Sequence, residues 1–412
     1  MEHVSNDSKH STSLTTIAYN HLLDAWAKSG HENSTKYVER ILERMHELFN
    51  AGYNTKPNKY SYTIAINTLA RSKEPRSAHR AQQILDKMIT HYNDKGNSDM
   101  MPTTATFNVV IDAWCRSGDV ESGKKAEAIL ERLIKLERPR NEIIRTGPQL
   151  QPNAITFNST ITAWARSGDA RAGEMAENLI TRMKNYDGVQ PNTVTYNALI
   201  DAHGQSRDMA GITLAESVIS RMEEYNQSEN SAPSAVKPNT VTYNTLINVH
   251  ANSEVRGKAR NAKNVFFRMR DKGIEPDIVT YCCLLKTCSQ IWNKDHKEIE
   301  ESLAFALDVY DYVRESKTVA PNEIIYASMI DVYNNLLLQK SEKESFLKDI
   351  FYRCCQDGFL SNRILKKIRQ NVSPNVFNQM IGPEFRNKNN VHDLPALWSR
   401  KASTKSTKQN TL

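Results

Sequence analysis

The stretch Val241-Thr-Tyr-Asn-Thr-Leu-Ile247 decides the fold, because versions of it recur along the chain. Its apolar residues stand at Tyr243, Leu246 and Ile247, and a bulky residue often follows seven positions after the tyrosine. This spacing places them on one face of an α-helix. The stretch is therefore interpreted as the first helix of a repeated structural unit.

An aromatic residue opens each of eight repeats, numbered 1 to 8 in chain order. These opening aromatics are Tyr19, Tyr62, Phe107, Phe157, Tyr196, Tyr243, Tyr281 and Tyr326. In repeats 1 to 6 a Met or Leu follows 26 residues later, at Met45, Met88, Leu133, Met183, Met222 and Met269. Because this distance is constant, the insertions fall between repeats. Two of the longer insertions, at 138–151 and 227–236, are interpreted as solvent loops.

A second periodic stretch, such as Ala172–Met183, follows a polar break in each repeat. The repeats close with a proline and a small polar residue: Pro57-Asn58, Pro102-Thr103, Pro152-Asn153, Pro191-Asn192, Pro238-Asn239, Pro276-Asp277 and Pro321-Asn322. Proline cannot continue the preceding helix, and the polar residue can cap the next one. A helical hairpin of this kind cannot bury its apolar face alone. The sequence therefore predicts an all-α solenoid of about eight stacked helical hairpins.

The bulk composition excludes several classes of protein. No apolar run is long enough to span a bilayer, so no membrane is expected as a partner. The six cysteines do not have the paired spacing of a zinc site, and they imply no disulfide framework. The net charge is +7, but the segment from Arg363 onward contributes +8 and the preceding residues sum to −1. Any basic groove must therefore come from local placement of cations.

The stretch at Val241–Ile247, ending its repeat in Lys272-Gly-Ile-Glu-Pro-Asp277, resembles a pentatricopeptide repeat. Val194–Ile200 and Ile155–Ile161 are similar, and the resemblance covers about residues 15–358. The Trp–Leu-Gly–Tyr pattern of tetratricopeptide repeats is not found. The resemblance implies a right-handed α-solenoid that binds single-stranded RNA, acts as a monomer, and supports RNA stability, processing or translation in a mitochondrion or plastid.

The same reading divides the chain into four segments. Residues 1–14 are expected to be a disordered N-terminus, and 15–358 the repeat array, with repeats opening near 17, 60, 105, 155, 194, 241, 279 and 324. Residues 359–385 are expected to be a degenerate C-terminal cap, and 386–412 a basic disordered tail. The basic stretch 363–369 either flanks bound RNA or caps the solenoid, and the sequence does not separate these alternatives.

By resemblance, each repeat reads one base with two side chains. One is the residue after the opening aromatic (the reader position), and the other is the residue after the closing proline (the cap position). The pairs are Asn20/Asn58, Thr63/Thr103, Asn108/Asn153, Asn158/Asn192, Asn197/Asn239, Asn244/Asp277 and Cys282/Asn322. Asn with Asn is expected to favour pyrimidines and Asn with Asp uracil, which implies a pyrimidine-rich target. The alternative for the cap position is an ordinary helix cap, and both roles can coexist.

Two further sets of residues are expected to contact RNA. The residues two positions before the opening aromatic (the flank position) would, by resemblance, sandwich bases: Ile17, Tyr60, Ile155, Val194, Val241 and Val279. Their alternative role is packing at the helix start. Eight residues beyond the reader position, Lys28, Arg71, Arg116 and Arg166 form a stripe of cations that can follow a phosphate backbone. Their alternative is a solvated helix end.

No catalytic, metal-binding or cofactor-binding constellation is found in the sequence, so no enzyme activity and no cofactor are expected. His203 and His250 occupy the position that tryptophan holds in other repeats, which favours packing over metal binding. The rival to RNA binding is a protein-binding helical scaffold without RNA affinity, favoured by the near-neutral charge of the repeats.

Overall fold

The fold was determined as a computed structural model, which describes residues 15–72, 74–95, 100–137, 150–227, 236–291, 295–316, 318–385 and 390–402. Helices are the only regular secondary structure in these ranges, so the all-α prediction is confirmed. The predicted disordered N-terminus (1–14) and nearly all of the two predicted solvent loops lie outside the described residues.

Each repeat forms a pair of helices, as predicted. The first helices are α1 (Thr16–Lys28), α3 (Lys59–Arg71), α5 (Thr104–Arg116), α7 (Ala154–Arg166), α9 (Thr193–His203), α11 (Thr240–Asn252), α13 (Ile278–Ser289) and α15 (Glu323–Leu336). The second helices are α2 (Ser34–Asn50), α4 (Ser77–Lys95), α6 (Ser122–Glu137), α8 (Ala172–Lys184), α10 (Met209–Gln227), α12 (Lys258–Asp271), α14 (His296–Glu315) and α16 (Lys340–Asp357).

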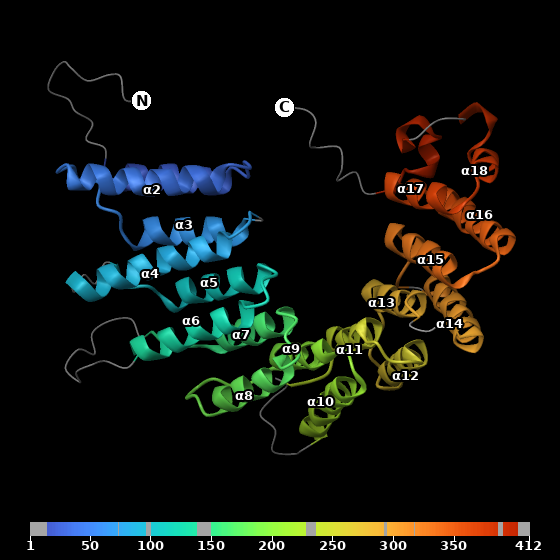
Figure 1. The fold of residues 1–412 in the computed structure, drawn as a ribbon, viewed down its shortest axis with the longest axis horizontal. Coiled ribbons are helices and arrows are strands. Elements are labelled where there is room, and N and C mark those ends of the chain that lie inside the picture. The colour runs from blue at the N-terminus through green and yellow to red at the C-terminus, as the bar shows by residue number, and fades with distance from the viewer. Residues whose placement is uncertain are drawn as a thin grey trace. The chain divides into compact units, whose positions relative to one another are not determined.

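The chain divides into two compact parts, residues 1–205 and 206–412. In the N-terminal part α1, α3, α5, α7 and α9 pack in series, and each second helix packs on the first helix of its own repeat and of the next (Figure 1). In the C-terminal part α11, α13, α15 and α17 (Asn362–Asn371) form the same kind of series. The predicted α-solenoid of stacked hairpins is thus present in each part.

The opening aromatics and the apolar residues of both helices form the core. Tyr62, Phe107, Phe157 and Tyr243 are fully buried. So are residues that follow an opening aromatic by 26 positions, such as Met45 and Met183. Burying an aromatic or large aliphatic side chain contributes about 1.5–3 kcal/mol each, so stacking supplies the driving force that a lone hairpin lacks.

In repeats 3 to 6 the ring seven residues after the opening aromatic contacts the second helix of the preceding repeat. The indole Nε1 of Trp164 donates to Glu127 Oε2 at 3.0 Å, and His250 Nε2 lies 3.2 Å from Glu216 Oε1. The Trp164 ring lies so close to Gly123 that a Cβ there would be 2.4 Å from it, which requires glycine. His203 and His250 are buried, in agreement with the packing role predicted for them.

The C-terminal residues contain more structure than the sequence predicts. α17 and α18 (Pro374–Ile381) form a further hairpin, followed by short 3₁₀ turns at Pro383–Phe385, Val391–Asp393 and Ala396–Trp398. The prediction of a disordered tail over 386–412 is wrong for residues 390–402. Leu360 N donates to Trp398 O at 2.8 Å, and the Trp398 ring packs edge-on against Phe351 of α16 at 5.9 Å. The basic composition concealed these apolar contacts, which cover the last second helix of the array.

Candidate nucleic-acid interface

The cap residues begin the first helices, as their sequence position predicts. Asn58, Thr103, Asn153, Asn192, Asn239, Asp277 and Asn322 each have extended backbone and accept a hydrogen bond from a backbone N–H of the first helical turn. In all but the last, a Ser or Thr three residues later completes a reciprocal capping box. The helix-cap role therefore exists at these positions, whatever else they do.

Four reader residues contact the cap residue of their own predicted pair. The side-chain Nδ2 donates to the cap oxygen Oδ1 over 3.3 Å from Asn20 to Asn58, and over 3.4 Å from Asn108 to Asn153. The distance is again 3.4 Å from Asn158 to Asn192. The fourth contact, from Asn244 to Asp277, is shorter, at 3.0 Å. Pairs that are 33 to 45 residues apart in the sequence are thus brought together by stacking of neighbouring first helices.

These contacts fix which atom of a cap asparagine is presented to a ligand. A backbone N–H can only donate, so the atom of Asn192 that caps Thr195 N at 3.1 Å must be its carbonyl oxygen. The Nδ2 of Asn158 donates to the same oxygen. The NH₂ group of Asn192 is left for an outside partner, and it is a hydrogen-bond donor. The same reasoning applies to Asn58 and Asn153.

Asp277 presents the opposite chemistry. Its Oδ1 accepts from Thr280 N at 2.8 Å, from Thr280 Oγ1 at 3.0 Å and from Asn244 Nδ2 at 3.0 Å. Burial disfavours the carboxylate, but these hydrogen bonds outweigh burial and hold the pKa of Asp277 below its usual value. The group is therefore ionised at neutral pH, and its second oxygen can only accept a hydrogen bond.

Two reader amides also accept a hydrogen bond from a hydroxyl group of the next repeat. Ser61 Oγ donates to Asn20 Oδ1 at 2.6 Å, and Thr195 Oγ1 donates to Asn158 Oδ1 at 2.6 Å. The corresponding oxygens of Asn108, Asn197 and Asn244 are buried and have no hydrogen-bond partner among the described residues. Asn20 and Asn158 are thus positioned by a hydroxyl of the next repeat.

The pairs Thr63/Thr103 and Cys282/Asn322 show no such contact in the described part of the chain. Thr63 Oγ1 donates to Lys59 O of its own helix at 2.7 Å. Burial raises the pKa of the Cys282 thiol to about 11, so this reader is a neutral, weakly polar group. Asn197 and Asn239 belong to different parts of the chain, and their separation is not described.

The flank residues lie in solvent rather than in the core. The exposed fractions are 68% for Ile17, 63% for Tyr60, 62% for Ile155, 58% for Val194 and Val241, and 50% for Val279. Packing at the helix start, the alternative role, does not account for such exposure. Ile324 of repeat 8, 48% exposed, also stands at the flank position and was missed. Counting two residues back from Tyr326 could have found it. A row of exposed aliphatic residues usually marks a binding surface.

The four predicted cations differ in their surroundings. Lys28 pairs with Asp24 at 2.6 Å and Arg116 with Asp112 at 2.5 Å, each one turn earlier on the same helix. Arg166 contacts Cys115 Sγ at 3.6 Å and opposes the rise that burial causes in the pKa of Asp201. Arg71 is exposed. Acidic neighbours therefore weaken the positive potential of Lys28 and Arg116.

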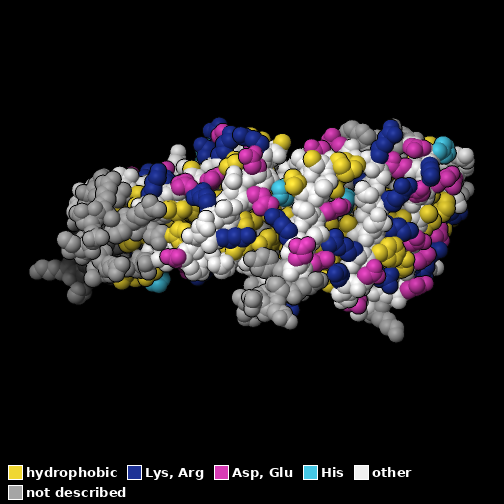
Figure 2. All heavy atoms as spheres, turned by 90° about the horizontal axis from the view of Figure 1, so that it is seen from below, with side chains coloured by type: hydrophobic (Ala, Val, Ile, Leu, Met, Phe, Trp, Pro, Cys, Tyr) yellow, Lys and Arg dark blue, Asp and Glu magenta, His cyan; other side chains and the backbone are white. Residues whose placement is uncertain are grey.

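A cation that the sequence analysis missed lies in repeat 7. Lys286 Nζ donates to Asn248 Oδ1 at 3.0 Å and to Asn252 Oδ1 at 2.7 Å of the preceding first helix. Its position, five residues after Tyr281, holds no lysine or arginine in repeats 1 to 6, so no recurrence pointed to it. On the face drawn in Figure 2, basic and acidic side chains lie intermingled, in keeping with the near-neutral charge of the repeats.

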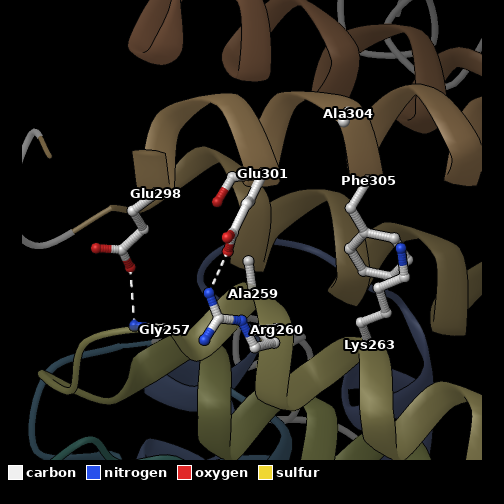
Figure 3. A pocket seen from close by; sticks show the side chains of 9 residues that line it. Gly257, Ala259, Arg260, Lys263, Glu298, Glu301, Ala304 and Phe305 are labelled. Carbon is white, nitrogen blue, oxygen red and sulfur yellow. Dashed lines mark hydrogen bonds and ion pairs between the residues drawn. The ribbon is translucent and has the colours of Figure 1, made fainter. Parts of the chain in front are cut away.

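A pocket of about 280 Å³ lies between the second helices α12 and α14 (Figure 3). Glu298 accepts from Gly257 N at 2.9 Å, Arg260 pairs with Glu301, and Lys263 Nζ lies 4.9 Å from the centre of the Phe305 ring. Because these groups already bond to or pair with one another, we interpret the pocket as part of the packing interface between successive hairpins. Within the described ranges, no cluster of His, Cys, Asp and Glu could hold a metal ion, and no helix is long and apolar enough to cross a membrane.

Stacked hairpins with a repeated reader–cap contact define the chain as a helical-repeat protein, and comparison with known proteins agrees. The PPR repeat family model matches residues 152–205 and 238–290, and the PPR repeat model matches 105–135 and 194–226. A pentatricopeptide repeat-containing protein of Arabidopsis thaliana is 32% identical over 118 residues, which is 29% of this chain and 18% of the relative. Residues 105–135, 152–226 and 238–290 thus contain pentatricopeptide repeats, and these matches support membership of the pentatricopeptide-repeat family.

Solved structures of the family are also similar. The crystal structure of the pentatricopeptide repeat protein PPR10 in complex with an 18-nt psaJ RNA element is 16% identical, with a TM-score of 0.37. The match covers 95% of this chain and 56% of that one. PPR10 from maize is 18% identical, with a TM-score of 0.36, and the match covers 89% of this chain and 56% of PPR10. The chain thus spans about half the length of the solved relatives and less than a fifth of the Arabidopsis relative.

Proposed function

We propose that this protein binds single-stranded RNA and selects bases through its reader and cap residues. The observation that carries the proposal is the contact between the two members of four predicted pairs, at 3.0 to 3.4 Å. Small polar side chains paired in this way recur at equivalent positions in repeats 1, 3, 4 and 6. A repeated set of this kind suits a repeated ligand that offers one base per repeat.

The chemistry of the caps supports a distinction between cytosine and uracil. The outward NH₂ of a cap asparagine donates a hydrogen bond, and cytosine offers an acceptor, N3, at the centre of its Watson–Crick edge. The outward oxygen of Asp277 accepts a hydrogen bond, and uracil offers a donor, N3–H, at the same place. Adenine N1 and guanine N1–H offer the same acceptor and donor, so the choice of pyrimidines over purines rests on the family's recognition pattern, in which repeats 1, 3, 4 and 5 select pyrimidines and repeat 6 selects uracil. The RNA runs 5′ to 3′ from the N-terminal to the C-terminal repeats.

The flank residues and the cations supply the rest of the affinity. Exposed aliphatic side chains such as Ile155 and Val194 cover the faces of the bases that the neighbouring amides read. Arg71, Arg166, Lys28 and Arg116 contact phosphates, with Arg71 and Arg166 contributing most because no acidic residue pairs with them on their own helices. Since the cations are few, the salt dependence of binding is shallow.

The biological role that fits such a protein is support of RNA stability, processing or translation in a mitochondrion or plastid, with the protein acting as a monomer and without catalysis. This assignment rests on the family. A protein-binding scaffold is the second candidate, and the mingled charges of Figure 2 favour it.

Electrophoretic or fluorescence-anisotropy titration of the full chain with short single-stranded RNAs separates the two candidates. The proposal predicts binding at about physiological salt, with cytidine- and uridine-rich oligonucleotides preferred over adenosine- and guanosine-rich ones. A folded protein that binds none of these RNAs supports the scaffold instead.

A further inference from the structure

The helix α17 continues the series of first helices in repeat register. It packs on α15. Ser361 caps it by accepting from Ile364 N at 3.3 Å, as Asn322 caps α15. Leu365 N donates to Ser361 O at 2.9 Å, which matches the bond from Tyr326 N to Asn322 O at 3.1 Å. Leu365 therefore takes the place of an opening aromatic, and like the aromatics it is buried.

This register assigns a role to the basic residues of α17. Arg363, two positions before Leu365, stands at the flank position, where the other repeats have exposed aliphatic or aromatic residues or alanine. Lys366, one position after Leu365, stands at the reader position, where the other repeats have Asn, Thr, Cys or Ala. Both cations are exposed, and neither forms an ion pair within the described ranges. The positions that hold base-contacting groups elsewhere thus carry positive charge here.

The junction between α15 and α17 has also lost the means to read a base. The reader of repeat 8 is Ala327, which is buried and has no polar side-chain atom. Lys367 Nζ lies 3.5 Å from Ala327 O and pairs with the carboxylate of Asp331. Ser361, the cap residue, donates to Glu323 Oε1 at 2.6 Å. The carboxylates of Asp331 and Glu323 are therefore occupied by partners other than Arg363 and Lys366.

We propose that Arg363 and Lys366 bind the phosphodiester backbone of the RNA where it leaves the array on the 3′ side, without regard to base. The inference rests on the proposed function and adds a sequence-independent anchor to it. α17 contains four Lys and Arg residues and no acidic residue, so its charge complements a polyanion. Both roles considered for the basic stretch 363–369 are then filled by α17. Its buried face caps the array, and its exposed face binds RNA.

The test compares the full chain with the double variant Arg363→Ala/Lys366→Ala. A matched control, Lys340→Ala/Lys348→Ala, removes the same charge from exposed positions on the second helix α16. Three labelled RNAs are used: the pyrimidine core read by repeats 1 to 6, and that core with an extension of about six adenosines at the 3′ or at the 5′ end, which is long enough to pass repeats 7 and 8. Affinity is measured from about 0.05 to 0.5 M salt.

The proposal predicts that the wild-type chain binds the 3′-extended RNA more tightly than the 5′-extended RNA, and that the Arg363/Lys366 variant loses this difference. Two lost phosphate contacts lower the slope of log K against log salt by about 1.4, which is about 25-fold in affinity at about 0.1 M salt. Base preference within the core stays unchanged, and the control variant keeps the wild-type slope.

Equal slopes for the wild type and the Arg363/Lys366 variant, in proteins that still prefer the pyrimidine core, overturn the anchor and leave the base-reading proposal intact. A gain from the 5′ extension alone also overturns it. If the wild-type chain binds none of the three RNAs, the proposed function itself fails, so the two failures are distinct.

Discussion

Asn244 and Asp277, 33 residues apart in sequence, are joined by a hydrogen bond of 3.0 Å from the asparagine Nδ2 to the carboxylate Oδ1. The same oxygen caps α13 by accepting from Thr280. One oxygen of Asp277 therefore stabilises the fold by capping α13, and the other is available to a ligand. At the six other cap positions of the predicted pairs the residue is Asn or Thr, and at the asparagines the outward group is a donor instead of an acceptor.

Exchanging this group should change the base that repeat 6 prefers. Asp277→Asn keeps the cap oxygen but presents an NH₂ group, so the preference moves from uracil to cytosine by about 1–3 kcal/mol at that position. Competition between RNAs that differ only at this nucleotide measures the shift. The reverse substitution, Asn192→Asp, should move repeat 4 from cytosine to uracil. Unchanged preferences in both variants would argue against base reading by cap residues.

The cap role can be tested without RNA. Asn153→Ala removes the acceptor for Thr156 N and should lower the free energy of unfolding by about 1 kcal/mol. Asn153→Asp retains an acceptor and should cost only a few tenths of that amount. Urea denaturation followed by circular dichroism measures both. If the alanine and aspartate variants are equally destabilised, the capping bond at Asn153 does not stabilise α7.

The sequence predicts the hairpins and the caps well because both depend on local periodicity and on proline placement. The bond from Asn158 to Asn192 follows once the repeats stack, since equivalent residues of successive first helices become neighbours. Contacts that break the repeat were not predictable. Lys286 is held by two asparagines of one neighbouring repeat, and no other repeat copies this arrangement. Trp398 packs on Phe351 from a segment whose basic composition predicts disorder.

The flank row should affect RNA binding without affecting the fold. Val194 and Val241 are both 58% exposed, so Val194→Ser/Val241→Ser should leave the unfolding free energy within about 0.5 kcal/mol of wild type. RNA affinity should fall several-fold, because the base faces lose apolar cover. Ile247→Ala serves as the contrast: this side chain is fully buried, and its loss should cost about 2–5 kcal/mol of stability. If the Val194→Ser/Val241→Ser variant is destabilised by a similar amount, these valines pack at the helix start instead.

The cations should contribute unequally. Arg71→Ala and Arg166→Ala should weaken RNA binding and lower the salt slope by about 0.7 each. Lys28→Ala should have a smaller effect, because Asp24 at 2.6 Å already offsets its charge. A second check removes the negative charge of Asp24: Asp24→Asn should strengthen RNA binding. A larger loss at Lys28 than at Arg71 would contradict this order.

The thiols should be protected in the folded protein. Burial raises the pKa of Cys288 and Cys355 to about 12 and that of Cys282 to about 11. An unfolded cysteine ionises near about 8.5, so the folded state keeps its protons as pH rises. The stability that these thiols contribute is present below that pH and is lost progressively above it. Titration with a thiol-specific disulfide reagent at about pH 8 should find the buried Cys288 and Cys355 unreactive until denaturant is added; rapid native reaction of these two would contradict their burial.

Selection from a pool of short random single-stranded RNAs, at about physiological salt and followed by sequencing, tests base reading most directly. The account predicts enrichment of pyrimidines at four or five spaced positions by the wild-type chain. It predicts that the enrichment at two of them disappears when Asn158 and Asn197 are changed to alanine, with the remaining positions unaffected. Enrichment of purines, or identical pools from the wild-type and variant proteins, would contradict the claim that this repeat array reads bases.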